Sequence, residues 1–174
     1  GGEMVRSFAN PGTMSAYWYG AYTRSCGGRR LTTQRYFPWF CLFQGFNASW
    51  YFNLHGHAGM AHEVGFAGDL RPLPHFEETS KACREIKTGL DMLLLNSALH
   101  TDGVCLYYSP ASVHENTFSN RPAAHATELL AWCELLQDLG VQYRFVSADQ
   151  VSAGELSNPG CKLLILPMVT AVTD

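Results

Sequence analysis

The segment from Asp102 to Asp174 constrains the fold most, because it reads as strand, helix, strand and strand joined by long connections. Val104–Tyr108 is a short apolar run rich in β-prone residues, which is typical of a strand buried on both faces. Val141–Val146 alternates like a strand, and Lys162–Pro167 is almost continuously apolar. Connections of this length can cross over a sheet, so the three strands are expected to run parallel.

A helix is expected between the first two of these strands. Asn120 is placed to cap it, and Pro122 suits its first turn, where a missing N–H costs little. Leu129 and Leu136 recur on one face, and Gly140 is placed to end the helix. The segment is therefore expected to form an α/β layer.

The amino-terminal half contains elements of the same kinds. The apolar positions of Leu31–Gln44 predict a helix, in which Pro38 predicts a kink or a late start. Phe46–Phe52 predicts a buried strand, and Phe76–Leu95 predicts a second helix with an acidic first turn. Gly1–Gly28 is expected to hold a short apolar stretch followed by a loop.

The composition is that of a folded protein. Of the 174 residues, 47% are apolar and 16% are charged, which is enough for one good core or two small ones. The net charge of −3 gives no electrostatic reason to expect nucleic acid or an anionic membrane as a partner. The sequence shows neither a long apolar run typical of a membrane span nor a signal peptide.

The six cysteines are widely spaced and form no C-x-x-C motif. This pattern favours buried, reduced thiols over disulfides or a metal site. A reducing compartment follows, and we expect a cytoplasmic protein.

The carboxy-terminal motifs resemble a known family. The series Leu106–Pro110, Leu135–Gly140, Tyr143–Ser147 and Leu163–Pro167 resembles the start of the trimerisation domain of family-42 glycoside hydrolases, the β-galactosidase-like enzymes. In that family this flavodoxin-like domain, related to glutamine amidotransferases, follows a catalytic (β/α)8 barrel. The resemblance extends over the segment that begins at Asp102.

The amino-terminal half resembles the end of that barrel in the order of its elements. Trp39–Gly45 is similar to the end of the seventh barrel helix, and the strand, loop and helix that follow match the eighth unit. The resemblance implies an α/β fold: the C-terminal part of a (β/α)8 barrel over residues 1–100, then a partial flavodoxin-like parallel sheet over 101–174. The chain opens without a methionine and stops just after a core strand, so we expect a piece of a longer protein.

The resemblance also implies where the chemistry lies. Glu3 would be the catalytic nucleophile at the end of the seventh strand, and the acid/base would lie outside this chain. The end of the eighth strand and its loop would reach the active-site face, where Trp50, Asn53, His55 and His57 provide an aromatic surface and hydrogen-bonding groups for a sugar. Trp50 fits a position in an aromatic core somewhat better than a sugar-stacking position.

No metal or cofactor is expected. His55, His57 and His62 lack a further ligand at a diagnostic spacing. No G-x-G-x-x-G phosphate loop follows the first carboxy-terminal strand, which argues against nucleotide binding. Neither Cys105 nor Cys161 lies at a strand-to-helix elbow, so an amidotransferase-like enzyme is the weakest interpretation.

Two functions remain open. The first is a fragment of a retaining glycoside hydrolase that cleaves terminal glycosides, with a carbohydrate substrate, and that is inactive alone and forms a homo-oligomer. The second is a non-catalytic α/β binding or assembly module, whose exposed strands would be covered by self-association.

Overall fold

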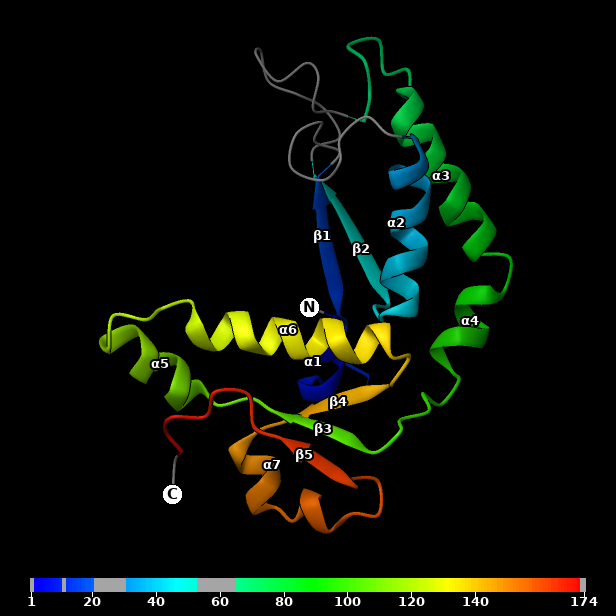
Figure 1. Cartoon of the computed structure of the whole chain (residues 1–174). Helices are drawn as coiled ribbons and strands as arrows, with labels where there is room; N and C mark the ends of the chain where they lie inside the picture. The colour runs from blue at the N-terminus through cyan, green and yellow to red at the C-terminus, as the bar shows by residue number, and fades with distance from the viewer. Residues whose placement is uncertain (1, 11, 21–30, 53–64, 173–174) are drawn as a thin grey trace. The chain divides into compact units, whose positions relative to one another are not determined.

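The chain folds into two compact units (Figure 1). The computed structural model describes residues 2–10, 12–20, 31–52 and 65–172. Residues 3–8 and 98–174 make up unit 1, and Gly2 with residues 9–97 makes up unit 2. Both units contain parallel strands and helices, which confirms the α/β class. None of the described helices is long and apolar enough to span a membrane.

Unit 2 contains a parallel pair of strands with helices along one side. Its described elements are β1 (Ala16–Gly20), α2 (Leu31–Phe43), β2 (Ala48–Phe52), α3 (Pro74–Ile86) and α4 (Leu90–Leu95). The strands pair in register from Ala16 opposite Ala48 to Gly20 opposite Phe52. Helix α2 connects the two strands and packs along α3 (Figure 1).

Three sequence predictions for unit 2 need correction. Strand β1 lies where a loop was expected, because its pairing with β2 stabilises a five-residue segment that has no apolar alternation of its own. Helix α2 begins at Leu31 with Pro38 inside it, so the late start was wrong. The single helix expected up to Leu95 is two helices, which are separated at Gly89, where φ is +118°.

Unit 1 is a three-stranded parallel sheet between helices. Its described elements are α1 (Gly2–Phe8), β3 (Val104–Tyr107), α5 (Pro110–Phe118), α6 (Ala124–Asp138), β4 (Tyr143–Val146), α7 (Ala148–Ser152), the 3-10 helix η1 (Glu155–Ser157) and β5 (Leu163–Ile165). The strand order is β4–β3–β5, and both pairs are parallel, as expected.

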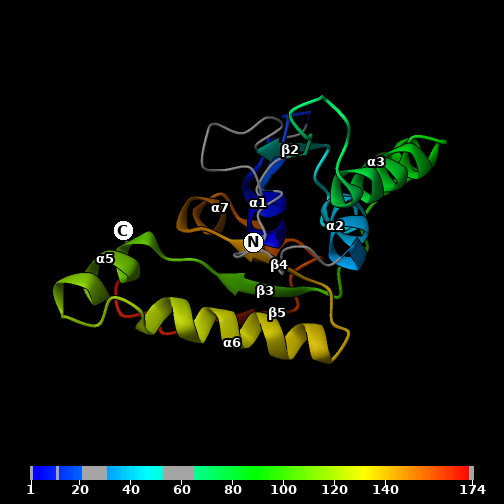
Figure 2. The same cartoon turned by 90° about the horizontal axis from the view of Figure 1, so that it is seen from above.

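The two faces of this sheet carry separate apolar clusters. Leu106 and Phe145 pack with α6, whereas Cys105 and Val146 pack with α7 and the segment that leads into β5. Helices α6 and α7 lie on opposite faces of the sheet in both views (Figures 1 and 2). Alternating side chains of one strand therefore enter two different cores.

The connection from β3 to β4 differs from the sequence prediction. Ser109 caps an additional helix, α5, by accepting a hydrogen bond from the Ser112 N–H at 3.1 Å. Asn120 is not a helix cap but has φ of +58° in the turn after α5. Helix α6 then begins at Ala124 and ends before Gly140, whose φ of +69° suits the expected termination.

Helix α1 protects the free edge of β4. The Ser7 hydroxyl oxygen accepts a hydrogen bond from the Phe145 N–H at 2.9 Å, and the Ser7 carbonyl accepts one from Gln150 Nε2 at 3.3 Å. The Phe8 ring lies 6.4 Å from the Phe145 ring. Helix α1 thus satisfies one backbone N–H of β4, which is an edge strand of the described sheet.

Candidate functional site

Two tryptophans form an aromatic surface on the strand pair of unit 2. Trp18 and Trp50 are partners in the parallel register, so both project from the same face. Each has 59% of its surface exposed. An exposed pair of indoles is a surface on which a sugar ring can stack.

The other face of these strands is covered by helices. The Tyr17 ring lies 5.2 Å from the Phe37 ring of α2 and 5.7 Å from the Phe46 ring. The Tyr51 ring lies 6.4 Å from the Phe76 ring of α3. The strand period of two therefore places tyrosines toward the helices and tryptophans away from them.

Only part of the predicted sugar site lies within the described residues. Trp50 is exposed on the helix-free face of unit 2. Asn53, His55 and His57, together with His62, fall outside the described residues. Their role in substrate binding stays a prediction. Trp18 was not singled out from the sequence, although it lies in an aromatic-rich segment.

Glu3 is not at the end of a strand. It lies in the first turn of α1, ahead of β1, and is 7% exposed. Its carboxylate pairs with the guanidinium of Arg6 one turn later. Burial lowers the pKa of Arg6, with a smaller opposing effect from Tyr143. Glu3 is therefore a buried, ion-paired side chain of α1, and its predicted role as a nucleophile stays untested.

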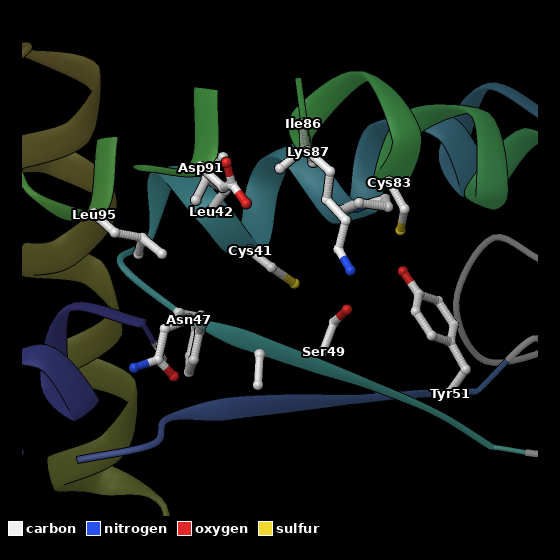
Figure 3. A pocket seen from close by; sticks show the side chains of 13 residues that line it. Cys41, Leu42, Asn47, Ser49, Tyr51, Cys83, Ile86, Lys87, Asp91 and Leu95 are labelled. Atoms are coloured by element: carbon white, nitrogen blue, oxygen red, sulfur yellow. The ribbon is translucent and has the colours of Figure 1, made fainter. Parts of the chain in front are cut away.

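A cavity of about 480 Å³ lies between β2 and the helices of unit 2 (Figure 3). Its walls are mostly apolar and include Pro38, Leu42 and Phe46. The polar and sulfur-containing side chains that line it come from four elements, the residue after α3 and the turn before β2: Cys41, Asn47, Ser49, Tyr51, Cys83, Lys87 and Asp91. The volume is within the range of small-molecule sites.

Several of these groups converge. The side chains of Cys41, Ser49, Tyr51, Cys83 and Lys87 point toward one another across the cavity (Figure 3). They come from α2, β2, α3 and the residue after α3, so no stretch of sequence brings them together. No local pattern predicts this cluster, because its members are spread over three elements and the residue after α3.

Burial keeps the thiols and the phenol neutral. It raises the pKa of Cys41 to about 12, and the neighbouring Cys83 contributes in the same direction. Burial also raises the pKa of Tyr51 and of Cys83, although a hydrogen bond with Tyr51, followed by the charges of Lys87 and Arg84, partly opposes the shift at Cys83. These thiols are weak nucleophiles at neutral pH, which argues against covalent chemistry here.

A second, smaller cavity lies at the carboxyl ends of β3 and β4 in unit 1. It encloses about 130 Å³ and is lined by the capping residues Ser109 and Ser147. Asp149 lines it as well, and a carboxylate opposes anion binding at this position. Within the described residues no group of three or more His, Cys, Asp or Glu side chains could hold a metal ion.

Comparison with known proteins supports the fold. No family model matches the chain, and no curated protein sequence does. The chain is similar to the crystal structure of a β-galactosidase from the psychrophilic Marinomonas ef1, with a TM-score of 0.63 and 16% sequence identity. The match covers 84% of this chain and 23% of that chain. The chain thus spans less than a quarter of that enzyme's length, and it shares with it a mixed α/β fold.

Proposed function

We propose that this chain is part of a glycoside hydrolase related to β-galactosidases. Unit 2 supplies two strands of the catalytic (β/α)8 barrel, and unit 1 supplies the start of a flavodoxin-like assembly domain. One observation carries the proposal: β1, α2 and β2 form a parallel strand–helix–strand unit whose helix-free face bears Trp18 and Trp50. In a barrel, the helix-free face of each strand is the inner one.

The arrangement of unit 1 supports the second part of the proposal. In the order β4–β3–β5 the first strand in the chain is central and the next two flank it. The flavodoxin-like order 2-1-3-4-5 begins in the same way. The structural similarity to a β-galactosidase is consistent with both parts but concerns the fold alone.

The reaction proposed for the parent enzyme is hydrolysis of a terminal glycoside with retention of configuration. This reaction needs two carboxyl groups about 5 Å apart, one as the nucleophile and one as the acid/base. Glu3 is the candidate nucleophile from the family resemblance. Its ion pair with Arg6 offers a structural role instead.

The test compares the 174-residue chain with a longer chain, called the extended chain, which also includes the residues encoded upstream of Gly1 in the gene. Both are assayed with a panel of aryl glycosides. We expect turnover of aryl β-galactosides by the extended chain and none by the shorter one. A folded extended chain that hydrolyses no glycoside would refute the proposal, and so would turnover by the 174-residue chain alone.

Variants of the extended chain assign the residues. Trp50→Ala should raise KM at least as much as it lowers kcat, because stacking binds the sugar. Glu3→Gln should lower kcat by several orders of magnitude if Glu3 is the nucleophile. Arg6→Met is the matched control. Equal losses of stability in the two variants, with kcat retained, would assign Glu3 to the ion pair.

A non-catalytic assembly module is the second candidate, and helix α6 favours it. Its buried face packs on the sheet through Leu129 and Leu136. Its outer side still carries Leu130 and Leu135, which are 57% and 47% exposed. A helix that is apolar on both sides is typical of one buried between two layers. Light scattering tests this candidate, because a module that assembles through α6 should be oligomeric at micromolar concentration.

A further inference from the structure

Leu70 lies at the tip of a hairpin that precedes α3. Residues 65–73 form this hairpin, and an antiparallel bridge between Phe66 and Pro72 closes it. We propose that Leu70 contacts the aglycone, the part of a glycoside that leaves as an alcohol, and that it makes the parent enzyme select substrates with an apolar aglycone. This inference rests on the proposed function and adds to it a substrate class and the residue that selects it.

The backbone at Leu70 has a conformation that leucine rarely adopts. Its φ is +62°, in the left-handed region that glycine and asparagine tolerate best. The side chain gains little from packing, since 71% of the residue's surface is exposed. Backbone conformation and exposure therefore both disfavour leucine here. A residue that departs from local preferences without a gain inside the fold points to a contact outside it.

Hydrogen bonds hold the tip of the hairpin in this conformation. The Leu70 N–H donates to the Ala67 carbonyl at 2.9 Å, and the Ala67 N–H donates to the Arg71 carbonyl at 2.8 Å. The Arg71 N–H donates to Asp69 Oδ1 at 3.1 Å, and Arg71 Nε lies 3.5 Å from Asp69 Oδ2. Leu70 is therefore presented to solvent by a turn that its own contacts define.

Aromatic side chains anchor the base of the hairpin to α3 and β2. The Phe66 ring lies 4.9 Å from the Phe76 ring of α3, which in turn lies 6.4 Å from the Tyr51 ring of β2. Gly65 is buried, and a Cβ at this position would lie 3.0 Å from the Phe76 ring. Close packing at the base thus fixes the hairpin against a helix and a strand.

The hairpin lies at the carboxyl ends of β1 and β2 in both views (Figures 1 and 2). In a (β/α)8 barrel this end of the strands carries the active site. An enzyme that removes a terminal sugar binds that sugar deepest, so the rest of the substrate lies toward the opening. The proposed function therefore places Leu70 on the rim of the site, where the aglycone would pass.

The tip has few polar groups to offer a ligand. The N–H groups of Ala67, Leu70 and Arg71 all donate within the hairpin. The charges of Asp69 and Arg71 are paired, and residues 65–73 carry no net charge. A second sugar would need hydrogen-bonding partners for its hydroxyl groups. An exposed leucine on a neutral, internally bonded turn suits an alkyl or aryl aglycone instead.

The test uses the extended chain and alkyl glycosides of the sugar that it hydrolyses best. Methyl and octyl glycosides have leaving groups of similar reactivity, so the ratio of their kcat/KM values measures contact with the aglycone. Leu70→Asn should lower the octyl-to-methyl ratio at least about fivefold, with kcat/KM for the methyl glycoside unchanged. Leu70→Met should keep the ratio within about twofold, because methionine is apolar and of similar volume. An unaltered ratio in Leu70→Asn would overturn the inference.

Leu93→Asn is the matched control. Leu93 of α4 is 62% exposed, and its helix lies toward the amino end of β2, since Leu95 lines the same cavity as Phe46. The ratio in Leu93→Asn should equal that of the unaltered extended chain. A similar fall in both asparagine variants, or an equal loss for both glycosides in Leu70→Asn, would indicate a general defect and refute the aglycone contact.

A stability measurement on the 174-residue chain tests the backbone conformation without any substrate. Leu70→Asn should have a urea midpoint no lower than that of the unaltered chain and higher than that of Leu70→Ser. Both variants remove the apolar contacts, but asparagine adopts the left-handed conformation at lower cost than leucine or serine. Equal midpoints for the two variants would remove the conformational argument and overturn the inference.

The inference and the proposed function fail in different ways. An extended chain that hydrolyses glycosides, with the same octyl-to-methyl ratio in Leu70→Asn, would keep the enzyme and reject the role of Leu70. A folded extended chain that is inactive on every glycoside would refute the proposed function and this inference with it.

Discussion

At the residue scale, the surroundings of a side chain decide its chemistry more than its type does. Cys41 and Cys83 are ordinary cysteines in the sequence, but burial keeps both thiols protonated. Asp102, in contrast, is stabilised as a carboxylate by the Gln142 N–H at 2.7 Å and by His100. Titration experiments can detect both effects.

Stability should fall at alkaline pH because of Cys41. Its folded pKa is about 12, whereas an unfolded thiol ionises at about 8.5. Above the unfolded pKa only the unfolded state gains by ionising, so this contribution to stability is lost as the pH rises from about 8.5 to about 12. In urea titrations at pH 7, 9 and 10, the free energy of unfolding should decline less steeply with pH for Cys41→Ala than for the unaltered chain. Parallel declines would contradict the assignment.

Asp102 should make stability depend on pH with the opposite sign. Its pKa is lowered by the Gln142 N–H first and by His100 second, so its contribution is present above the unfolded pKa of about 3.9 and is lost as the pH falls. Asp102→Asn should therefore be less stable than the unaltered chain in urea at pH 7. The two should converge near pH 2, and a difference that persists there would mean that the carboxylate charge is not the cause.

At the element scale, short polar and glycine positions set where elements begin and end. Gly89 separates α3 from α4, and Ser109 starts α5 where the sequence indicated only a turn. The hydroxyl of Ser112 joins α5 to the segment after β5, since it accepts from the Thr170 and Ala171 N–H groups at 3.0 Å each.

Replacing Gly89 should destabilise unit 2 through the backbone alone. A Cβ at Gly89 meets no atom within 4 Å, but φ of +118° is unfavourable for alanine by about 1–2 kcal/mol. Gly68→Ala is the control, because its Cβ is equally uncrowded and its φ is not positive. Equal urea midpoints for the two variants would refute the conformational explanation.

Ser112→Ala should destabilise unit 1. Ser112 is fully buried, and its loss leaves two backbone N–H groups unsatisfied, at a cost of about 1–3 kcal/mol each. The exposed Ser119→Ala should change the free energy of unfolding by less than about 0.5 kcal/mol. Chemical denaturation followed by circular dichroism provides the comparison, and similar values for both serines would argue against the buried network.

At the scale of the whole molecule, the two units have different sources of stability. Unit 1 has two apolar clusters on the faces of its sheet. Unit 2 rests on two strands with an exposed tryptophan face and on the packing of α2 against α3. We expect unit 2 to unfold at lower denaturant concentration than unit 1.

The four tryptophans allow this to be measured. Trp132 is the single tryptophan of unit 1, while Trp18, Trp39 and Trp50 belong to unit 2. A chain with Trp132 as its sole tryptophan should show a higher urea midpoint by fluorescence than the Trp132→Phe chain. Ser112→Ala should shift the Trp132 transition and leave the other in place. Coincident transitions would mean that the chain unfolds as one cooperative unit.

The sequence by itself determined the elements whose patterns are local and strong. The apolar runs of the three carboxy-terminal strands, the long crossovers and Gly140 were sufficient to predict a parallel α/β layer. Local signals were too weak for β1 and α5, which depend on strand pairing and on a buried serine network.

Only the tertiary structure decided the candidate sites. Trp50 was predicted because it lies near the carboxyl end of an expected strand, but its pairing with Trp18 depends on the register of β1 and β2. The cavity at Tyr51 and Lys87 joins side chains from four elements, and Glu3 meets Arg6 in a helix that packs on β4. The physical reason is the sequence distance over which each property is determined. A local pattern of apolar residues determines whether a segment is a helix or a strand, whereas a site depends on which faces of distant elements meet.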